Sequence, residues 1–152
     1  MFARAVFAFL AMPGVVAFAI PIVWIVHSRA RLAHPFGLAL LLIGCVGLLW
    51  CVRDFYVSGK GTLAPWSPPK HLVSVGLYRY SRNPMYIAVA CILLGWAVTF
   101  NFLPLYLYLL LVALAFHLRV IFGEEPWLAR THGDTWAKYS RQVPRWFWPS
   151  VH

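Results

Sequence analysis

Residues 85–121 read MYIAVACILLGWAVTFNFLPLYLYLLLVALAFHLRVI and contain two apolar runs, 85–100 and 102–121, with Asn101 between them. A helix needs roughly 20 apolar residues to cross a bilayer, and both runs come close to that length. A single intervening residue leaves room for a tight helical hairpin, or for two helices that barely cross. The stretch therefore predicts two neighbouring membrane helices.

Two further apolar runs lie upstream, at residues 6–26 and 36–52. Pro13 and Pro21 interrupt the first, and a membrane bundle tolerates such prolines because neighbouring helices can bond to the freed carbonyls. We therefore expect an all-α integral membrane protein of about four transmembrane helices, the first one kinked. The length favours one domain, 1–152.

The composition excludes most soluble and disordered classes. The chain is 62% hydrophobic and 11% charged, whereas soluble domains are about half apolar and a quarter charged. The net charge of +9 is typical of basic residues that flank membrane spans, so we expect no nucleic-acid partner. Cys45, Cys51 and Cys91 are odd in number and lack CxxC spacing, which argues against a disulfide framework or a metal site.

The distribution of lysine and arginine predicts the orientation of the spans. Four spans place both termini, a loop at 53–84 and a tail at 123–152 on one side, with eleven of the thirteen basic residues. The other side has Arg29 and Arg31. By the positive-inside rule the loop, the tail and both termini are cytoplasmic, and the short chain favours a bacterial inner membrane.

The cytoplasmic loop ends in GLYRYSRNPMY, residues 76–86. Asn83 before Pro84 predicts an N-cap followed by the first helical residue. The unpaired N–H groups of that helix, together with Arg82, would form a site for a carboxylate or phosphate. The alternative is a capped helix with an interfacial arginine and tyrosine belt, and local sequence leaves both open.

The tail opens with the adjacent carboxylates Glu124 and Glu125, followed by an interfacial helix expected at about 127–140. Adjacent carboxylates repel each other and would gain from a shared cation or hydroxyl partner. Arg119 and Arg130 are nearby partners that would make the pair a solvated helix end instead. Both interpretations remain open at the level of sequence.

The loop and the tail resemble one known family. They are similar to the membrane methyltransferases that include isoprenylcysteine carboxyl methyltransferases and phosphatidylethanolamine N-methyltransferases. The resemblance rests on residues 76–86 and on EEPWL at 124–128, followed by GDTWAKYSRQVPRW at 133–146. The isoprenylcysteine enzymes usually have His where this chain has Asn83, so the sequence looks more like the phospholipid-methylating branch.

The resemblance implies S-adenosylmethionine as cofactor and a cytoplasmic site formed by the loop and the tail. The cofactor-binding residues that it implies are Tyr78, Arg82, Asn83, Tyr86, Glu124 and Glu125. It also points to Glu125, Tyr139 and Arg145 as catalytic residues that position the substrate. If the acceptor arrives protonated, Glu125, Tyr139 or His117 would be candidate bases. A lone histidine such as His117, near the end of an apolar run, is more often a packing residue.

We therefore expect methyl transfer to a lipid-soluble or amphipathic acceptor that enters from the bilayer. Such a reaction is an in-line displacement, so the protein mainly holds the reactants in line and excludes water. One alternative is a non-catalytic four-helix membrane module. Another is an NADPH-dependent relative of the membrane sterol reductases, which share a similar pair of motifs in much longer chains. The sequence leaves the oligomeric state open.

Overall fold

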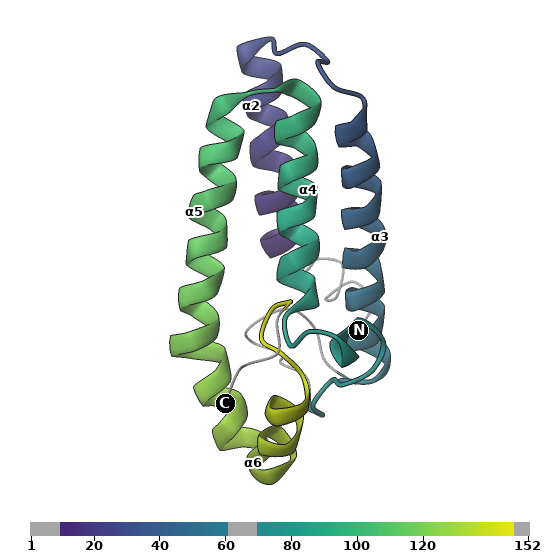
Figure 1. The fold of residues 1–152 in the computed structure, drawn as a ribbon, viewed down its shortest axis with the longest axis vertical. Coiled ribbons are helices and arrows are strands. Elements are labelled where there is room, and N and C mark those ends of the chain that lie inside the picture. Colours follow the sequence, from purple (N-terminus) through teal and green to yellow (C-terminus); the bar gives the residue numbers. More distant parts are fainter. Residues whose placement is uncertain (1–9, 61–69, 148–152) are drawn as a thin grey trace.

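The computed structural model describes residues 10–60 and 70–147, and these ranges form helices and loops without strands. The elements in chain order are η1 (Leu10–Ala19), α2 (Ile20–Ser28), α3 (Phe36–Val57), η2 (Gly76–Arg79), α4 (Pro84–Phe100), α5 (Leu103–Arg119), η3 (Val120–Glu124) and α6 (Glu125–Gln142). Helices α2 to α5 run along the long axis, and α6 lies at one end (Figure 1). The predicted all-α class is confirmed for this part of the chain. The predicted segments at 6–9, 61–69 and 148–152 lie outside the described residues.

Two described helices are long and apolar enough to cross a membrane. They are α3 and the apolar first part of the continuous stretch Leu103–Gln142, each with a mean hydropathy of 2.1. Only 28% and 17% of their most apolar windows are buried, so most of these side chains face outward, as lipid-facing side chains do. Two further apolar helices, Pro13–Ser28 and Pro84–Phe100, are shorter. The count of four spans therefore stays a prediction.

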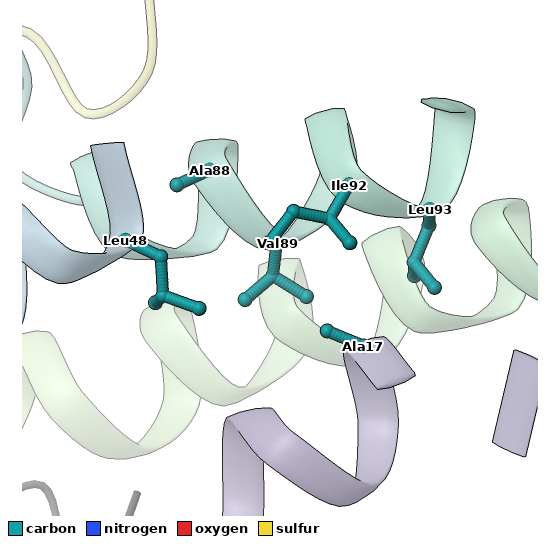
Figure 2. Packing of buried hydrophobic residues seen from close by; sticks show 6 residues of the cluster. All are labelled: Ala17, Leu48, Ala88, Val89, Ile92 and Leu93. Atoms are coloured by element: carbon teal, nitrogen blue, oxygen red, sulfur yellow. The ribbon is translucent and has the colours of Figure 1, made fainter. Parts of the chain in front are cut away.

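Helix α4 forms the centre of the bundle. Val89, Ile92 and Leu93 of α4 are buried and pack with Leu48 of α3 (Figure 2). A Cβ atom at Gly44 of α3 would lie 2.6 Å from Ile92 Cγ1 and 2.8 Å from the Ile92 backbone nitrogen. The two backbones therefore touch, as small residues permit at membrane helix interfaces.

The first helical segment is fastened to the bundle at its proline. Pro21 has no N–H, so neither Ala17 O, four residues back, nor Val16 O, five residues back, receives a bond from it. Trp96 Nε1 donates to Ala17 O at 2.9 Å, and the Tyr108 hydroxyl donates to Val16 O at 2.9 Å. Neighbouring helices thus bond to these carbonyls, as the sequence predicts.

Helices α4 and α5 form the tight hairpin that is one of the two predicted arrangements. Asn101 adopts a left-handed conformation with φ 45°, and its N–H bonds to the carbonyls of Ala97 and Val98. This conformation ends α4 and reverses the chain, because asparagine tolerates positive φ better than most residues. Helix α5 begins two residues later, at Leu103.

Two predicted boundaries are wrong. Helix α3 continues to Val57 rather than ending at 52, because the charged residues Arg53 and Asp54 end the apolar run without removing any helical hydrogen bond. Helix α6 begins at Glu125, two residues before the predicted start. The π-helical segment 120–124 carries the helix directly from α5 into α6.

Candidate functional site

A cavity of about 80 Å³ lies at the α6 end of the bundle. Its walls come from the end of α3, the loop around η2, the start of α4, the end of η3 and one face of α6. Six of the eight predicted site residues line it, namely Tyr78, Arg82, Asn83, Tyr86, Glu124 and Tyr139. Glu125 and Arg145 do not line the cavity. Glu125 forms an ion pair with Arg82, which does line it, and Arg145 forms an ion pair with Glu125. The structure therefore brings the loop and tail motifs together.

The residues before α4 are hydrogen-bonded to the tail after α6. The Arg82 N–H donates to Pro144 O at 2.9 Å, and the Ser81 hydroxyl donates to Arg145 O at 3.2 Å. Ser81 Oγ in turn accepts from the Asn83 N–H at 3.1 Å. These bonds connect segments more than 60 residues apart and hold the two motifs in fixed register.

Asn83 precedes α4 as predicted, but its side chain does not cap the helix. Its Nδ2 donates to Arg145 O at 3.1 Å instead. Asn83 is therefore the N-cap residue by position, as predicted, while its amide is turned toward the tail. Pro84 begins the helix as predicted, and its missing N–H needs no partner there.

Glu124 and Glu125 have separate partners. Adjacent residues on a helix point about 100° apart, so the two carboxylates diverge. Glu124 pairs with Arg119 at 2.8 Å, whereas Glu125 pairs with Arg82 at 3.0 Å. The two carboxylates share no cation among the described residues. Glu124 has a hydroxyl partner and the expected neighbour Arg119, whereas Arg130 donates to a backbone carbonyl instead.

Glu125 stands between two arginines. Arg145 donates through Nε at 2.9 Å and through Nη2 at 2.8 Å, one bond to each carboxylate oxygen. Burial lowers the pKa of Arg82, and the nearby Glu125 opposes that shift. The hydrogen bonds that Arg145 donates to Glu125 raise the pKa of Arg145. The paired carboxylate therefore neutralises a guanidinium that would otherwise be buried with an uncompensated charge.

Glu124 belongs to a second network that reaches the cavity. The Tyr86 hydroxyl and Arg119 Nε both donate to Glu124 Oε1. The Tyr86 ring stacks on Phe116 of α5 with centroids 4.3 Å apart. The Tyr86 side chain of α4 is thereby held by contacts with α5 and with the end of η3.

The tyrosines of the cavity are hydrogen-bond donors rather than bases. The Tyr139 hydroxyl donates to Tyr78 O at 2.7 Å. Burial raises the pKa of both phenols well above their ordinary value. Tyr139 therefore stays protonated near neutral pH and fastens α6 to the loop around η2.

The comparison with known families decides the identity. The sequence profile described as phospholipid methyltransferase matches residues 32–135, about two thirds of the chain. The chain belongs to the phospholipid methyltransferase family. No curated protein and no solved structure shows a significant match to it. As a member of this family it is a membrane methyltransferase, and methyltransferases of the family generally use S-adenosylmethionine.

Sequence reasoning missed four polar or aromatic residues of this methyltransferase's cavity, of which Phe55 is one. His71, His132 and Trp136 line it, and the Arg82 guanidinium lies 5.6 Å from the centroid of the Trp136 ring. A signal for two of them was present, since Leu128, His132 and Trp136 follow one another at helical spacing of four residues.

His117 is a packing residue in this methyltransferase, as its position predicts. Trp146 Nε1 donates to His117 Nδ1 at 3.2 Å, and the two rings stack with centroids 6.0 Å apart. His117 does not line the cavity. The contact joins the end of α5 to the tail beside Arg145.

Proposed function

We propose that this methyltransferase transfers the methyl group of S-adenosylmethionine to a lipid-soluble or amphipathic acceptor at the cytoplasmic face of a bacterial inner membrane. The observation that carries the proposal is the convergence of both motif segments on one cavity at one end of the bundle. Arg29 and Arg31 lie in the α2–α3 connection at the opposite end (Figure 1). Their separation from the cavity supports its cytoplasmic orientation.

The polar atoms of the cavity fit this cofactor. Arg82 Nε is buried and bonds to no atom of the described residues, and an unpaired buried donor gains free energy when a ligand pairs with it. This guanidinium would hold the carboxylate of the cofactor. Both bonds to Glu124 reach Oε1, which leaves Oε2 to hold the ammonium group or a ribose hydroxyl.

The size of the cavity indicates that its walls must separate when the cofactor binds. The volume of the cavity is about 80 Å³, whereas binding sites for small molecules of the cofactor's size enclose roughly 300 Å³ or more. The loop around η2 and helix α6 are joined across the cavity by the Tyr139 hydrogen bond. We infer that the cofactor enters by separating these two walls.

The cavity also offers an apolar wall for the acceptor. Phe55 of α3, Met85 of α4 and Leu128 of α6 line it. The bound cofactor supplies a methyl group on a positively charged sulfur, which is already a good leaving group. The apolar side chains would hold an acceptor in line with that methyl group and exclude water. Phe55 and Met85 belong to helices of the bundle, so their position suits an acceptor that enters from the bilayer between helices.

Calorimetric titration of the detergent-solubilised protein tests the proposal. Saturable binding of both S-adenosylmethionine and S-adenosylhomocysteine is expected. Arg82→Ala and Glu125→Ala should abolish binding, since one removes the donor and the other its counterion. Arg31→Ala, at the opposite end, is the matched control and should bind as the wild type does.

Two results would contradict the proposal. No binding of either compound by folded protein would favour a non-catalytic four-helix membrane module. Binding of NADPH in place of both compounds would favour a reductase-like relative. Normal binding by both cavity variants would show that the cofactor site lies elsewhere.

A further inference from the structure

His132 has a buried ring nitrogen, Nε2, without a hydrogen-bond partner among the described residues. The residue lines the cavity from α6, and its Nε2 bonds to no atom of the described chain. The ring meets the Trp127 indole edge-on, with centroids 6.2 Å apart and planes at 84°. Packing therefore supports the imidazole on one side and leaves Nε2 to a ligand of the cavity.

The backbone that follows positions His132. Gly133 has φ 50° and ψ −120°, which breaks the helical path inside α6. Residues with a Cβ rarely adopt this conformation. The break comes directly after His132 and redirects the second half of α6, so that Trp136 and Tyr139 line the same cavity.

Three other polar side chains of the cavity are already engaged, and the free Glu124 Oε2 and Arg82 Nε are the atoms proposed above to hold the cofactor. Tyr139 donates to a carbonyl of the η2 turn, Tyr86 donates to Glu124, and the Asn83 amide donates to a tail carbonyl. None of them can accept a proton from a ligand without losing a protein contact. The titratable groups that face the cavity with His132 are His71 and Tyr78 from the loop, Arg82 before α4, Tyr86 from α4, Glu124 before α6 and Tyr139 from α6. His71 is exposed, whereas His132 is half-buried.

We propose that His132 is the catalytic base that takes a proton from an amine or hydroxyl group of the acceptor. The inference rests on the proposed methyl transfer. The lone pair of the acceptor atom forms the bond to the methyl carbon, and the carbon–sulfur bond breaks with its electrons remaining on sulfur. The proton of the acceptor passes to Nε2, and water later removes it. An imidazole nitrogen with a free lone pair can accept this proton, which suits it to the role of a general base.

The inference defines the class of acceptor. The reacting atom must carry a proton that has to leave, as in an amine or an alcohol. A carboxylate acceptor has no such proton and would need no base. The apolar wall of the cavity suits a hydrocarbon part attached to this amine or hydroxyl head.

The test compares His132→Gln and His132→Phe with the wild type. Glutamine keeps a hydrogen-bonding side chain that cannot take a proton, and phenylalanine keeps a ring against Trp127. The probe is phosphatidylcholine vesicles containing phosphatidylethanolamine, with methyl-labelled S-adenosylmethionine. Both variants should bind S-adenosylhomocysteine as the wild type does, yet transfer methyl groups about a hundredfold more slowly at pH 7. His27→Gln, on α2, is the control and should match the wild type.

The pH dependence separates a base from a structural residue. The deficit of His132→Gln should shrink as the pH rises toward the pKa of the acceptor amine, because more acceptor then arrives already deprotonated. A deficit that is equal at every pH, a wild-type rate, or loss of S-adenosylhomocysteine binding would each overturn the assignment. Absence of S-adenosylhomocysteine binding in the wild type would instead overturn the proposed function. Cofactor binding without transfer to vesicles that contain either phosphatidylethanolamine or a lipid alcohol would overturn the inference alone.

Discussion

Replacing Glu125 by glutamine should cost far more stability than the same change at the adjacent Glu124. The Glu125 side chain is 16% exposed, and that of its partner Arg82 is 9% exposed. Removing the carboxylate charge leaves this guanidinium buried without a counterion. Breaking a buried ion pair costs about 3–5 kcal/mol. We take the lower end, about 3 kcal/mol, because the second partner, Arg145, is 35% exposed and can be hydrated.

Glu124→Gln is the matched control. Glu124 is 32% exposed and its partner Arg119 is 44% exposed, and exposed ion pairs contribute about 0–1 kcal/mol. A glutamine oxygen can still accept from the Tyr86 hydroxyl. The two substitutions should therefore differ by about 2 kcal/mol.

Thermal unfolding in one detergent measures the difference. For a chain of this length, 1 kcal/mol corresponds to about 2–4 °C. Glu125→Gln should lower Tm by about 6–12 °C and Glu124→Gln by less than about 4 °C. The double variant Arg82→Gln with Glu125→Gln should lose less than the sum of the single losses. Equal shifts at the two glutamates, or additive losses in the double variant, would refute the assignment of a buried pair.

Three further predictions follow from the backbone and the buried phenols. Gly133→Ala should destabilise the protein by about 1–3 kcal/mol, because residues with a Cβ rarely adopt the backbone conformation of Gly133. Gly123→Ala places its methyl group in open space and should be neutral or slightly stabilising. Chemical denaturation compares the two variants, and equal losses of stability would contradict the reasoning. Gly44→Val should lower stability by about 1–3 kcal/mol, since the added side chain collides with the α4 backbone; an unchanged Tm would show that α3 and α4 can separate. The raised pKa values of Tyr78 and Tyr139 favour the folded state below pH 10, the ordinary tyrosine value, and this stability is lost as the pH rises further, because the unfolded chain ionises first. Thermal unfolding from pH 7 to pH 11 should show that decline, and Tyr139→Phe should weaken it.

The sequence predicts the helices and their turns because those depend on local patterns. The apolar runs at 36–52 and 85–100 lie within α3 and α4, and the run at 102–121 covers α5 and the start of η3. The single residue Asn101 between two runs allows the observed hairpin. Pro21 predicts a need for donors from neighbouring helices, and Trp96 and Tyr108 supply them. Which aromatic residues would do so is set by the packing of α4 and α5, and no local pattern encodes it.

The candidate site is predicted less completely, because its geometry depends on the directions in which side chains point, and residue types alone do not give these directions. Six of the eight predicted site residues line the cavity, but adjacency in sequence does not show that Glu124 and Glu125 pair with different arginines. Asn83 has the expected position and an unexpected bond, since the tail carbonyl lies more than 60 residues away. His132 escapes notice because a histidine beside a glycine has no distinctive pattern until Gly133 is seen to break the helix.

The bonds between the segment before α4 and the tail affect the order in which the protein matures. Asn83 and Arg145 are 62 residues apart, so at 5–20 residues per second the ribosome delivers the second about 3–12 s after the first. During this interval the Asn83 side-chain amide and the Ser81 hydroxyl lack the tail carbonyl to which they donate. Under the proposed orientation these groups lie at the water-facing end of the bundle and can bond to water until the tail is made. In the hydrocarbon core of the bilayer they would have no hydrogen-bond partner. Biogenesis thus gives a reason, independent of chemistry, for the site to form at the membrane surface.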